Sequence, residues 1–250
     1  PALEPAYKRV FGYHRVGDCA AFPGFPPFAD RVVSDLEIVF GREVSPEAKA
    51  LAAASVLAKE RVASGAVDLD FAAFPAFEHQ RLSSARAVHF PRAALFLDPG
   101  LGKTKAVLDS LIALTRLVQH PIRALVLCPS HLVFNWGLEV DKHGQGLVGT
   151  HLLCTSSGKT PTKKARTKLW DTFTQSAFSS SSNPPVTLAA ASYDCLRTDL
   201  AYLRSHVVGL GLDVLVCDES HQIANVSSQR TKNVAKLAVD VPRRILLSGT

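Results

Sequence analysis

Cysteine is scarce in this chain and follows no recognisable spacing. The five cysteines are Cys19, Cys128, Cys154, Cys195 and Cys217, an odd number that includes no Cys-x-x-Cys pair. Disulfide frameworks and structural zinc sites both need cysteines at short, paired spacing. The distribution therefore excludes both as the organising feature of the fold. We expect reduced and mostly buried thiols, as in proteins of the cell interior.

Long apolar runs are absent, and so is methionine. No stretch reaches the roughly 18 uninterrupted apolar residues that a membrane-spanning helix needs. The N-terminus lacks the charged and then apolar order of a secretory signal. We therefore expect an intracellular protein, cytoplasmic or nuclear, that is not secreted and has no membrane partner. Because the chain has no methionine and ends at Ser248-Gly249-Thr250, directly after an apolar run, we interpret it as a piece of a longer polypeptide.

The composition is that of a globular protein with a modest positive charge. At 250 residues, the chain is long enough for one large domain or for a domain with an extension. Apolar residues make up 47% and charged residues 20%, which excludes a disordered chain. The net charge of +6 favours an anionic partner, with nucleic acid first. Since this charge is small, a merely basic soluble protein remains an alternative.

The apolar pattern changes near residue 74. Before it, residues 1–44 are rich in proline and phenylalanine, and a helix is predicted from an N-cap at Ser45 to about Ala63. We assign residues 1–73 to an N-terminal accessory segment and residues 74–250 to the main domain. In that domain, apolar runs of strand length alternate with helical stretches. The runs are 93–97, 124–128, 151–154, 186–191, 214–217 and 245–247.

Runs that are apolar on both faces are typical of strands covered by helices on both sides. The main domain is therefore predicted to be an α/β fold, with a mostly parallel sheet and helices on both faces. In such folds the ligand-bearing loops follow the carboxyl ends of the strands.

Residues 155–185 interrupt the alternation with a serine run and a basic cluster. The basic residues are Lys159, Lys163, Lys164, Arg166 and Lys168. They could face phosphates, but a solvated helix face is the commoner explanation of such a run. Ser157-Gly158-Lys159-Thr160 imitates a phosphate-binding loop. We set it aside because it lacks a second glycine and no strongly apolar helix follows it.

A more convincing phosphate-binding loop spans residues 98–104, between an apolar run and a helix expected over 106–118. Gly100 and Gly102 have no Cβ, so backbone N–H groups can wrap a polyphosphate, and the helix N-terminus attracts the same anion. Leu97 stands where the strict pattern has its first glycine. The loop alone therefore predicts a nucleotide binder and no more.

The end of the loop carries the reactive side chains. Lys103 would reach the β- and γ-phosphates, and the Thr104 hydroxyl would hold Mg²⁺. Pro99 and Leu101 complete the cradle around the nucleotide.

Two adjacent acids, Asp218 and Glu219, follow the buried run 214–217. One carboxylate would hold Mg²⁺ while the next orients and deprotonates the attacking water. An exposed acidic turn after a core strand is the alternative. Together with the Lys-Thr loop, the pair favours nucleotide hydrolysis.

These motifs resemble those of superfamily 2 helicases and translocases, in particular the Snf2 branch. Asp218-Glu219-Ser220-His221 is similar to the D-E-x-H box of motif II. Further motifs stand in the family's order: the glutamine motif at His79-Gln80, motif Ia at 125–136, the next Snf2 motif at 189–199, the extended motif II at 218–225 and motif III at 244–250. The resemblance covers residues 74–250 and implies the first RecA-like lobe of a P-loop NTPase.

The resemblance also implies roles for single residues, with ATP and Mg²⁺ as cofactors. Gln80 would select adenine. Asp218 would bind the metal, and Glu219 would be the catalytic base. Lys103 would bind the phosphates. The coupling residues would be His221, Ser248, Gly249 and Thr250, which link nucleotide state to nucleic-acid contact.

Four residues lie where the family contacts nucleic acid, namely Ser130, His131, Tyr193 and Arg197. Trp136 could stack on a base, but the usual burial of tryptophan favours packing. The chain departs from the family's usual residues at Leu97-Asp98-Pro99, Ala224 and Ser248.

The implied function is the ATP-binding lobe of a DNA-dependent ATPase that couples Mg-ATP hydrolysis to movement along duplex DNA. In this family a second RecA-like lobe closes over the nucleotide and supplies arginine fingers, so these 250 residues alone are expected to bind ATP weakly and to hydrolyse it poorly. One alternative is another superfamily 2 motor, either a helicase acting on RNA or DNA or a restriction-system translocase subunit. A second alternative is a truncated, non-catalytic interaction module that binds nucleotide.

Overall fold

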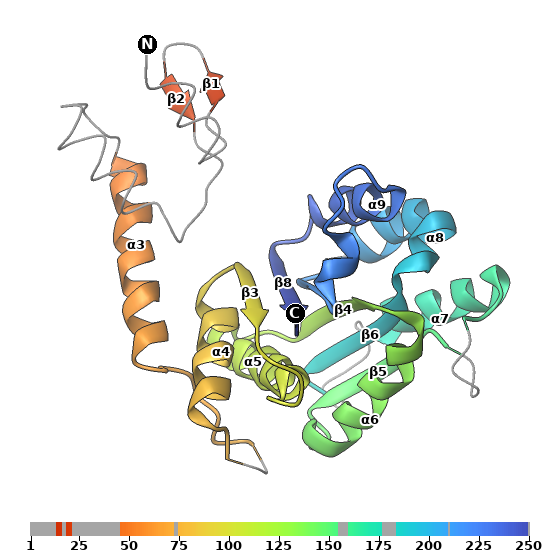
Figure 1. Ribbon diagram of the computed structural model, residues 1–250, viewed down its shortest axis with the longest axis horizontal. Coiled ribbons are helices and arrows are strands. Elements are labelled where there is room, and N and C mark those ends of the chain that lie inside the picture. The colour runs from red at the N-terminus through yellow and green to blue at the C-terminus, as the bar shows by residue number, and fades with distance from the viewer. Residues whose placement is uncertain are drawn as a thin grey trace. The chain divides into compact units, whose positions relative to one another are not determined.

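The computed structural model describes residues 14–16, 19–21, 46–72, 75–154, 160–176, 184–209 and 211–249. Thr250 and most of the 157–160 motif lie outside these residues. The chain divides into two compact units, Pro1–Ser64 and Gly65–Thr250 (Figure 1). In the first unit, strands β1 (His14–Val16) and β2 (Cys19–Ala21) pair antiparallel. The same unit contains the predicted helix, α3 (Pro46–Ala63).

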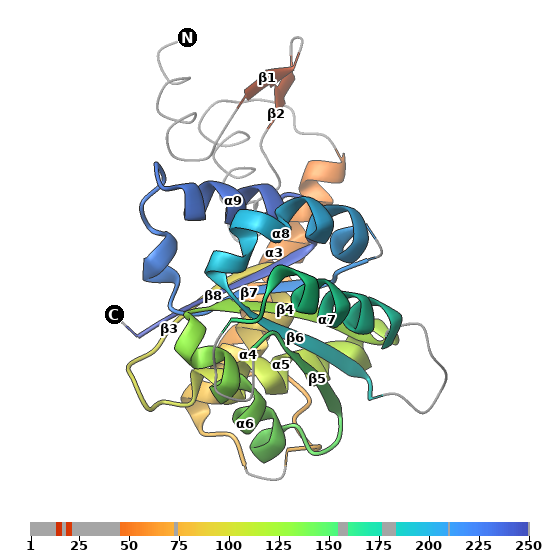
Figure 2. The ribbon, with the colours of Figure 1, turned by 90° about the vertical axis from the view of Figure 1, so that its right-hand side faces the viewer.

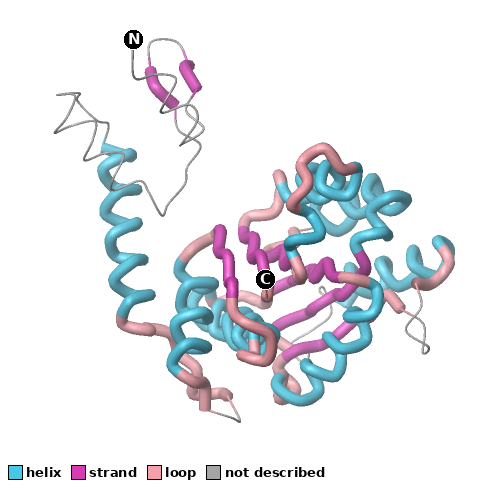
Figure 3. Tube along the Cα trace, viewed as in Figure 1, coloured by secondary structure: helices cyan, strands magenta, loops and turns pink. Residues whose placement is uncertain are grey.

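The second unit is built on one six-stranded sheet in which all neighbours run parallel. Figure 3 shows its strands in magenta among the cyan helices. Its strands are β3 (Arg92–Phe96), β4 (Ile122–Cys128), β5 (Val148–Leu152), β6 (Val186–Ser192), β7 (Val214–Cys217) and β8 (Arg243–Ser248). The spatial order is β3-β8-β7-β4-β6-β5. The predicted fold class is confirmed, since every expected apolar run contributes to a strand.

Helices cover both faces of this sheet (Figure 2). On one face lie α4 (Glu78–His89), α5 (Lys103–Val118) and α6 (Val133–His143). The other face carries α7 (Lys163–Ser176), α8 (Leu196–Tyr202) and α9 (Gln229–Ala238). Three short helices follow strand ends, namely η3 (Ser130–Leu132), η4 (Tyr193–Cys195) and η6 (Ser220–Ile223), and η5 (Leu203–Val208) continues α8.

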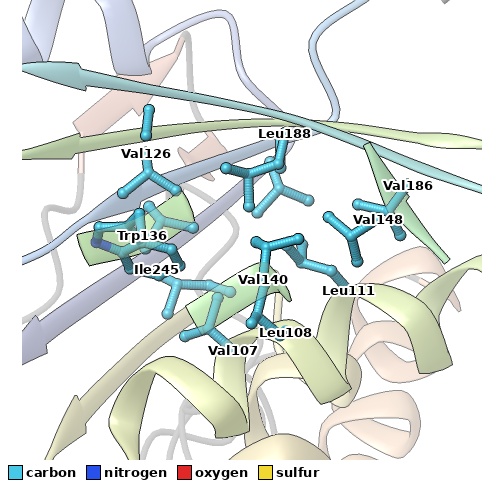
Figure 4. Packing of buried hydrophobic residues seen from close by; sticks show 14 of the residues in the cluster. Val107, Leu108, Leu111, Val126, Trp136, Val140, Val148, Val186, Leu188 and Ile245 are labelled. Atoms are coloured by element: carbon cyan, nitrogen blue, oxygen red, sulfur yellow. The ribbon is translucent and has the colours of Figure 1, made fainter. Parts of the chain in front are cut away.

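The core consists of two apolar layers, one on each face of the sheet. Successive strand residues point to opposite faces, so in β4 the side chain of Val126 joins the α4–α6 layer while Leu125 and Leu127 join the other. Figure 4 shows Val126 packed with Trp136 and other side chains of the first layer. This double burial explains why the strands are continuous apolar runs rather than alternating ones.

Helix α5 is buried along most of its length, from Lys105 to Thr115. Two of its buried side chains carry charge, and they pair with each other: Lys105 Nζ lies 2.5 Å from Asp109 Oδ2, one turn along the helix. Burial raises the pKa of Asp109, although the Lys105 ammonium opposes this. The pairing allows a helix with charged residues to run inside the core, with its N-terminus at the carboxyl edge of the sheet.

The second unit begins at Gly65, earlier than the boundary expected between residues 73 and 74. Leu69 is buried against Val88 and Ala113. Asp68 pairs with Arg116 of α5 at 2.5 Å. The segment from Gly65 to Ala72 therefore packs on the sheet domain. Where the family's own domain begins stays a prediction.

The basic cluster of residues 155–185 does not form one charged face. Arg166 is 7% exposed and binds Asp199 through two hydrogen bonds of 2.7 and 2.9 Å. Lys163, Lys164 and Lys168 of α7 are exposed. The solvated-face interpretation thus fits these three lysines, whereas Arg166 is a buried link between α7 and α8.

Candidate functional site

The glycine-rich loop and the two acids meet at one edge of the sheet. The loop follows β3, the acids follow β7, and β8 lies between these strands. Since all three strands are parallel, their carboxyl ends share an edge, where Phe96 pairs with Ser248 and Leu97 N donates to Ser248 O at 3.3 Å. A Cβ at Gly249 would lie 3.1 Å from Lys103 Nζ. The end of β8 therefore lies next to the Lys103 side chain, at the end of the glycine-rich loop.

The loop adopts a conformation that only glycine takes easily at two positions. Gly100 has φ +84° and Gly102 has φ +76°. No atom lies within 4 Å of a Cβ built at Gly100, whereas a Cβ at Gly102 would lie 2.4 Å from Gln80 Nε2. Backbone conformation explains the first glycine, and both conformation and close approach explain the second.

Lys103 is the first residue of α5, and its side chain turns back over the loop. Its Nζ donates to Leu97 O at 2.7 Å and to Asp98 O at 3.2 Å. Thr104 follows it, half-buried, in the first turn. An ammonium group at a helix N-terminus, beside a loop with two left-handed glycines, is a donor set that fits a polyphosphate.

Gln80 lies in the first turn of α4 and joins that helix to the loop. It is 6% exposed, and its Nε2 donates to Leu101 O at 3.1 Å while its Oε1 accepts from Phe77 N at 3.2 Å. His79 Nε2 also contacts Leu101 O, at 3.0 Å. The structure thus places His79 and Gln80 directly against the glycine-rich loop.

Asp218 is buried at the end of β7, and each of its carboxylate oxygens accepts a hydrogen bond. Oδ2 accepts from Trp136 Nε1 at 3.0 Å, and Oδ1 accepts from Glu219 N at 2.9 Å. Burial raises the pKa of Asp218, whereas these two donors and the nearby charge of Lys103 act in the opposite direction. The two donors hold the carboxylate in one orientation.

Trp136 lies 2% exposed in the core, so the packing interpretation is confirmed. Its bond to Asp218 was not predicted. A buried indole needs an acceptor for its one N–H, and this rule signals that a partner exists. It cannot identify a partner 82 positions away along the chain.

Glu219 has a left-handed backbone, with φ +49° and ψ +53°. Its Oε2 lies 3.3 Å from His221 Nδ1, and both side chains are partly exposed. Gln222 N donates to Glu219 O at 3.0 Å, which begins η6. The acid therefore stands next to the buried Asp218 and turns toward solvent. The coupling role expected for His221 and Ser248 stays a prediction.

The four residues expected to contact nucleic acid come together beyond the ends of β4 and β6. Ser130, His131 and Tyr193 line a pocket of about 220 Å³. Tyr193 and Arg197 line an adjoining pocket of about 370 Å³. Ser130, His131 and Arg197 are exposed. Tyr193 is 2% exposed, and its hydroxyl donates to Asp218 O at 2.8 Å.

Arg230 of α9 lines both pockets and was not predicted from the sequence. It donates to Gln222 Oε1 at 2.9 Å and to Asp194 Oδ1 at 3.0 Å. Its guanidinium also lies over the Tyr193 ring, 5.9 Å from the centroid. No local pattern around Arg230 indicates these partners, because they come from other strand ends.

Among the described residues, no three His, Cys, Asp or Glu side chains form a metal-binding group. A Mg²⁺ ion held by Thr104 and Asp218 would take its remaining ligands from phosphate and water, as this ion usually does. In the same part of the chain, no helix is both long and apolar enough to span a bilayer.

A parallel sheet with a phosphate loop after one strand and an acid pair after another defines a RecA-like P-loop NTPase lobe. The chain belongs to the SNF2-related domain family, whose profile matches residues 85–250. The resemblance to Snf2-type superfamily 2 ATPases is therefore confirmed.

The similar proteins include DNA repair proteins. The DNA repair protein rhp54 of Schizosaccharomyces pombe is 32% identical over 159 residues, covering 61% of this chain and 17% of that protein. The RAD54-like DNA repair and recombination protein of Gallus gallus is 31% identical over 159 residues, covering 61% and 20%. The chain thus spans at most about a fifth of the length of these curated relatives.

Two solved structures share the fold at low identity. The Sulfolobus solfataricus SWI2/SNF2 ATPase core in complex with dsDNA aligns with a TM-score of 0.53 and 20% identity, covering 74% of this chain and 34% of that one. The type ISP restriction-modification enzyme LlaGI, in complex with a DNA substrate mimic, aligns with a TM-score of 0.52 and 17% identity, covering 71% and 18%.

Proposed function

We propose that this chain is the ATP-binding lobe of a DNA-dependent ATPase that couples Mg-ATP hydrolysis to movement along duplex DNA. The observation that carries the proposal is the meeting of Lys103, Asp218 and Glu219 at one edge of the sheet, with β8 between their strands. An anion-binding loop alone would fit any nucleotide binder. An adjacent acid pair is what hydrolysis additionally requires.

On this proposal the loop from Pro99 to Thr104 binds the phosphates. Lys103 exchanges its bonds to the Leu97 and Asp98 carbonyls for phosphate oxygens. Thr104 and Asp218 would hold Mg²⁺, which would supply positive charge to the phosphates. Glu219 accepts the proton of the attacking water.

Gln80 suits the selection of adenine. Its amide has two N–H donors and two oxygen lone pairs. One N–H is used on Leu101 O and one lone pair on Phe77 N. One donor and one acceptor remain, and adenine presents the complementary pair at N7 and N6.

Duplex DNA is the partner that the comparisons favour, since the relatives are DNA repair proteins and one structural neighbour is bound to dsDNA. We assign the contact to the exposed residues Ser130, His131 and Arg197, with Tyr193 behind them. We also propose that a second RecA-like lobe, in a longer polypeptide, completes the site, and that His221, Ser248, Gly249 and Thr250 transmit nucleotide state to the DNA-contacting face.

The test measures ATP hydrolysis by the natural polypeptide that contains these residues, with duplex DNA, single-stranded DNA or RNA. We expect stimulation by duplex DNA. Lys103→Ala should abolish nucleotide binding, whereas Glu219→Gln should retain binding and lower turnover by about 10² or more. Lys142→Ala and Glu139→Gln, on the surface of α6, are the matched controls and should resemble the wild type.

Each other outcome contradicts a stated part of the proposal. Stimulation by RNA alone would replace duplex DNA with RNA and favour a helicase. Nucleotide binding without hydrolysis would favour an interaction module. For the 250 residues alone, strong DNA-stimulated hydrolysis would contradict the requirement for a second lobe.

A further inference from the structure

The peptide group between Asp218 and Glu219 is held at both of its polar atoms. The carbonyl oxygen of Asp218 accepts a hydrogen bond from Tyr193 Oη at 2.8 Å. The N–H of Glu219 donates to Asp218 Oδ1 at 2.9 Å. With both ends bonded, this peptide plane cannot rotate without losing two hydrogen bonds.

The orientation of this peptide decides where Glu219 points. Glu219 has φ +49°, a left-handed conformation that a side chain with a Cβ rarely adopts. Such conformations persist when surrounding bonds hold them, and they concentrate at functional sites. Rotation of the preceding peptide would relieve the strain and redirect the carboxylate. The Tyr193 hydroxyl is the only group from another segment, among those the structure describes, that is seen to bond this peptide.

We propose that Tyr193 is a positioning residue for the ATPase reaction, one that acts by holding the peptide before Glu219 in its catalytic orientation. This inference rests on the proposed function. Tyr193 is 2% exposed, and its hydroxyl points into the protein, toward the end of β7.

The turn after β6, which contains Tyr193, also lies at the face assigned to DNA. Asp194, next to Tyr193, accepts from Arg230, which also donates to Gln222. Gln222 N in turn donates to Glu219 O. Glu219 is therefore joined to the turn after β6 on two sides, by Tyr193 directly and by Arg230 through Gln222. If DNA binding moves that turn, both sets of hydrogen bonds would shift the position of Glu219.

Tyr193→Phe tests the proposal, because it keeps the ring and its packing against Arg230 and removes only the hydroxyl. Tyr202→Phe is the matched control: its hydroxyl donates to Asp171, away from the strand-end site. The Tyr193 hydroxyl also contacts the buried Cys217, so Tyr193→Phe should lower the melting temperature at least as much as Tyr202→Phe. Assays use the natural polypeptide that contains these residues, with saturating duplex DNA.

We expect Tyr193→Phe to lower kcat about tenfold while KM for ATP and the affinity for a fluorescent ATP analogue change less than about twofold. Tyr202→Phe should keep the wild-type kcat. The DNA-stimulated rate of Tyr193→Phe should fall more than its basal rate.

Two results would overturn the inference. A wild-type kcat in Tyr193→Phe would show that the hydroxyl does not position Glu219. An equal loss of nucleotide affinity and turnover would show a general structural defect instead. If the wild type itself hydrolyses no ATP, the proposed function fails, and this outcome is distinct because it does not depend on either tyrosine.

Discussion

At the residue scale, the two tryptophans of the chain have the same local chemistry and different positions. Trp136 donates to Asp218 Oδ2 at 3.0 Å, and Trp170 donates to Asp199 Oδ2 at 3.2 Å. Both indoles are at most 2% exposed. Only Trp136 bonds the proposed metal ligand, Asp218. Comparing substitutions of the two tryptophans therefore distinguishes a hydrogen bond that orients a metal ligand from one that only stabilises the fold.

Trp136→Phe is expected to weaken Mg²⁺ binding. Removing a donor that orients a metal-binding carboxylate commonly lowers metal affinity by about tenfold or more. The Mg²⁺ concentration that half-saturates nucleotide binding should therefore rise by about that factor. Trp170→Phe should lower the stability of the protein but leave this Mg²⁺ concentration unchanged. If both variants shift the Mg²⁺ dependence equally, the effect is not specific to Asp218.

The loop glycines give a second prediction. Gly100→Ala meets no atom but must adopt φ +84°, which costs about 1–2 kcal/mol. Gly146→Ala has the same open surroundings at φ +72° and lies far along the chain from the loop. Chemical denaturation should show similar losses for the two. Only Gly100→Ala should also weaken ATP binding, measured by titration with a fluorescent analogue.

Gly102→Ala should be more severe than Gly100→Ala, because its Cβ would also displace Gln80. Equal effects of the two substitutions on ATP binding would show that the contact with Gln80 does not matter.

Sequence reasoning found those residues whose function follows from neighbours along the chain. The loop from Gly100 to Thr104 is such a case, because its spacing alone specifies a turn into a helix N-terminus. Arg230 and the Trp136 indole were missed because Asp194 lies 36 positions from Arg230 and Asp218 lies 82 positions from Trp136. The roles assigned to the predicted site residues stay predictions until they are measured.

At the scale of elements, helices α7 and α8 are linked by a buried ion pair. Arg166 and Asp199 are both under 10% exposed. Burial alone would raise the pKa of Asp199, but hydrogen bonds from Arg166, Thr198 and Trp170 outweigh it, and the pKa lies below its ordinary value. A depressed pKa means that the charged form stabilises the fold above the ordinary pKa of an aspartate, and that this stability is lost as the pH falls through the folded value.

Asp199→Asn should therefore destabilise the protein most at neutral pH. Leaving Arg166 buried without its carboxylate costs about 3 kcal/mol, and urea denaturation at pH 7 would measure it. Below about pH 4 the difference in stability between wild type and variant should narrow, since the Asp199 carboxylate of the unfolded wild-type chain takes up a proton first and the folded one follows at lower pH. Asp68→Asn, in the half-exposed pair with Arg116, is the control and should change stability by less than about 1 kcal/mol.

Element boundaries were predicted less well where the sheet ends. The apolar run 151–154 predicted a strand that proves to be Val148–Leu152. β5 lies at the edge of the sheet, and four of its five residues are only partly buried. An apolar run marks a strand when both faces are covered, as in β4 and β6. At an edge, pairing with the neighbouring strand decides the limits instead.

At the scale of the whole molecule, the start of the sheet domain can be tested by truncation. A chain beginning at Gly65 should fold with a cooperative transition. One beginning at residue 74 lacks Leu69 and the Asp68 partner of Arg116. Burial of a leucine contributes roughly 2 kcal/mol, so the shorter chain should be less stable by at least about that amount in urea denaturation. If the two truncated chains are equally stable, the domain boundary lies between residues 73 and 74, as the sequence suggested.

The position of β3 also bears on how the protein is made. β3 stands at the edge of the sheet and pairs with β8, which follows the other five strands of this sheet along the sequence. During synthesis, the segment that bears Lys103 therefore leaves the ribosome long before its partner strand, and it waits unpaired until residues 243–248 emerge. Non-local pairing of this kind slows folding. ATP binding by nascent chains of increasing length should consequently begin only once residues 243–248 are free, so the nucleotide would report completion of this sheet.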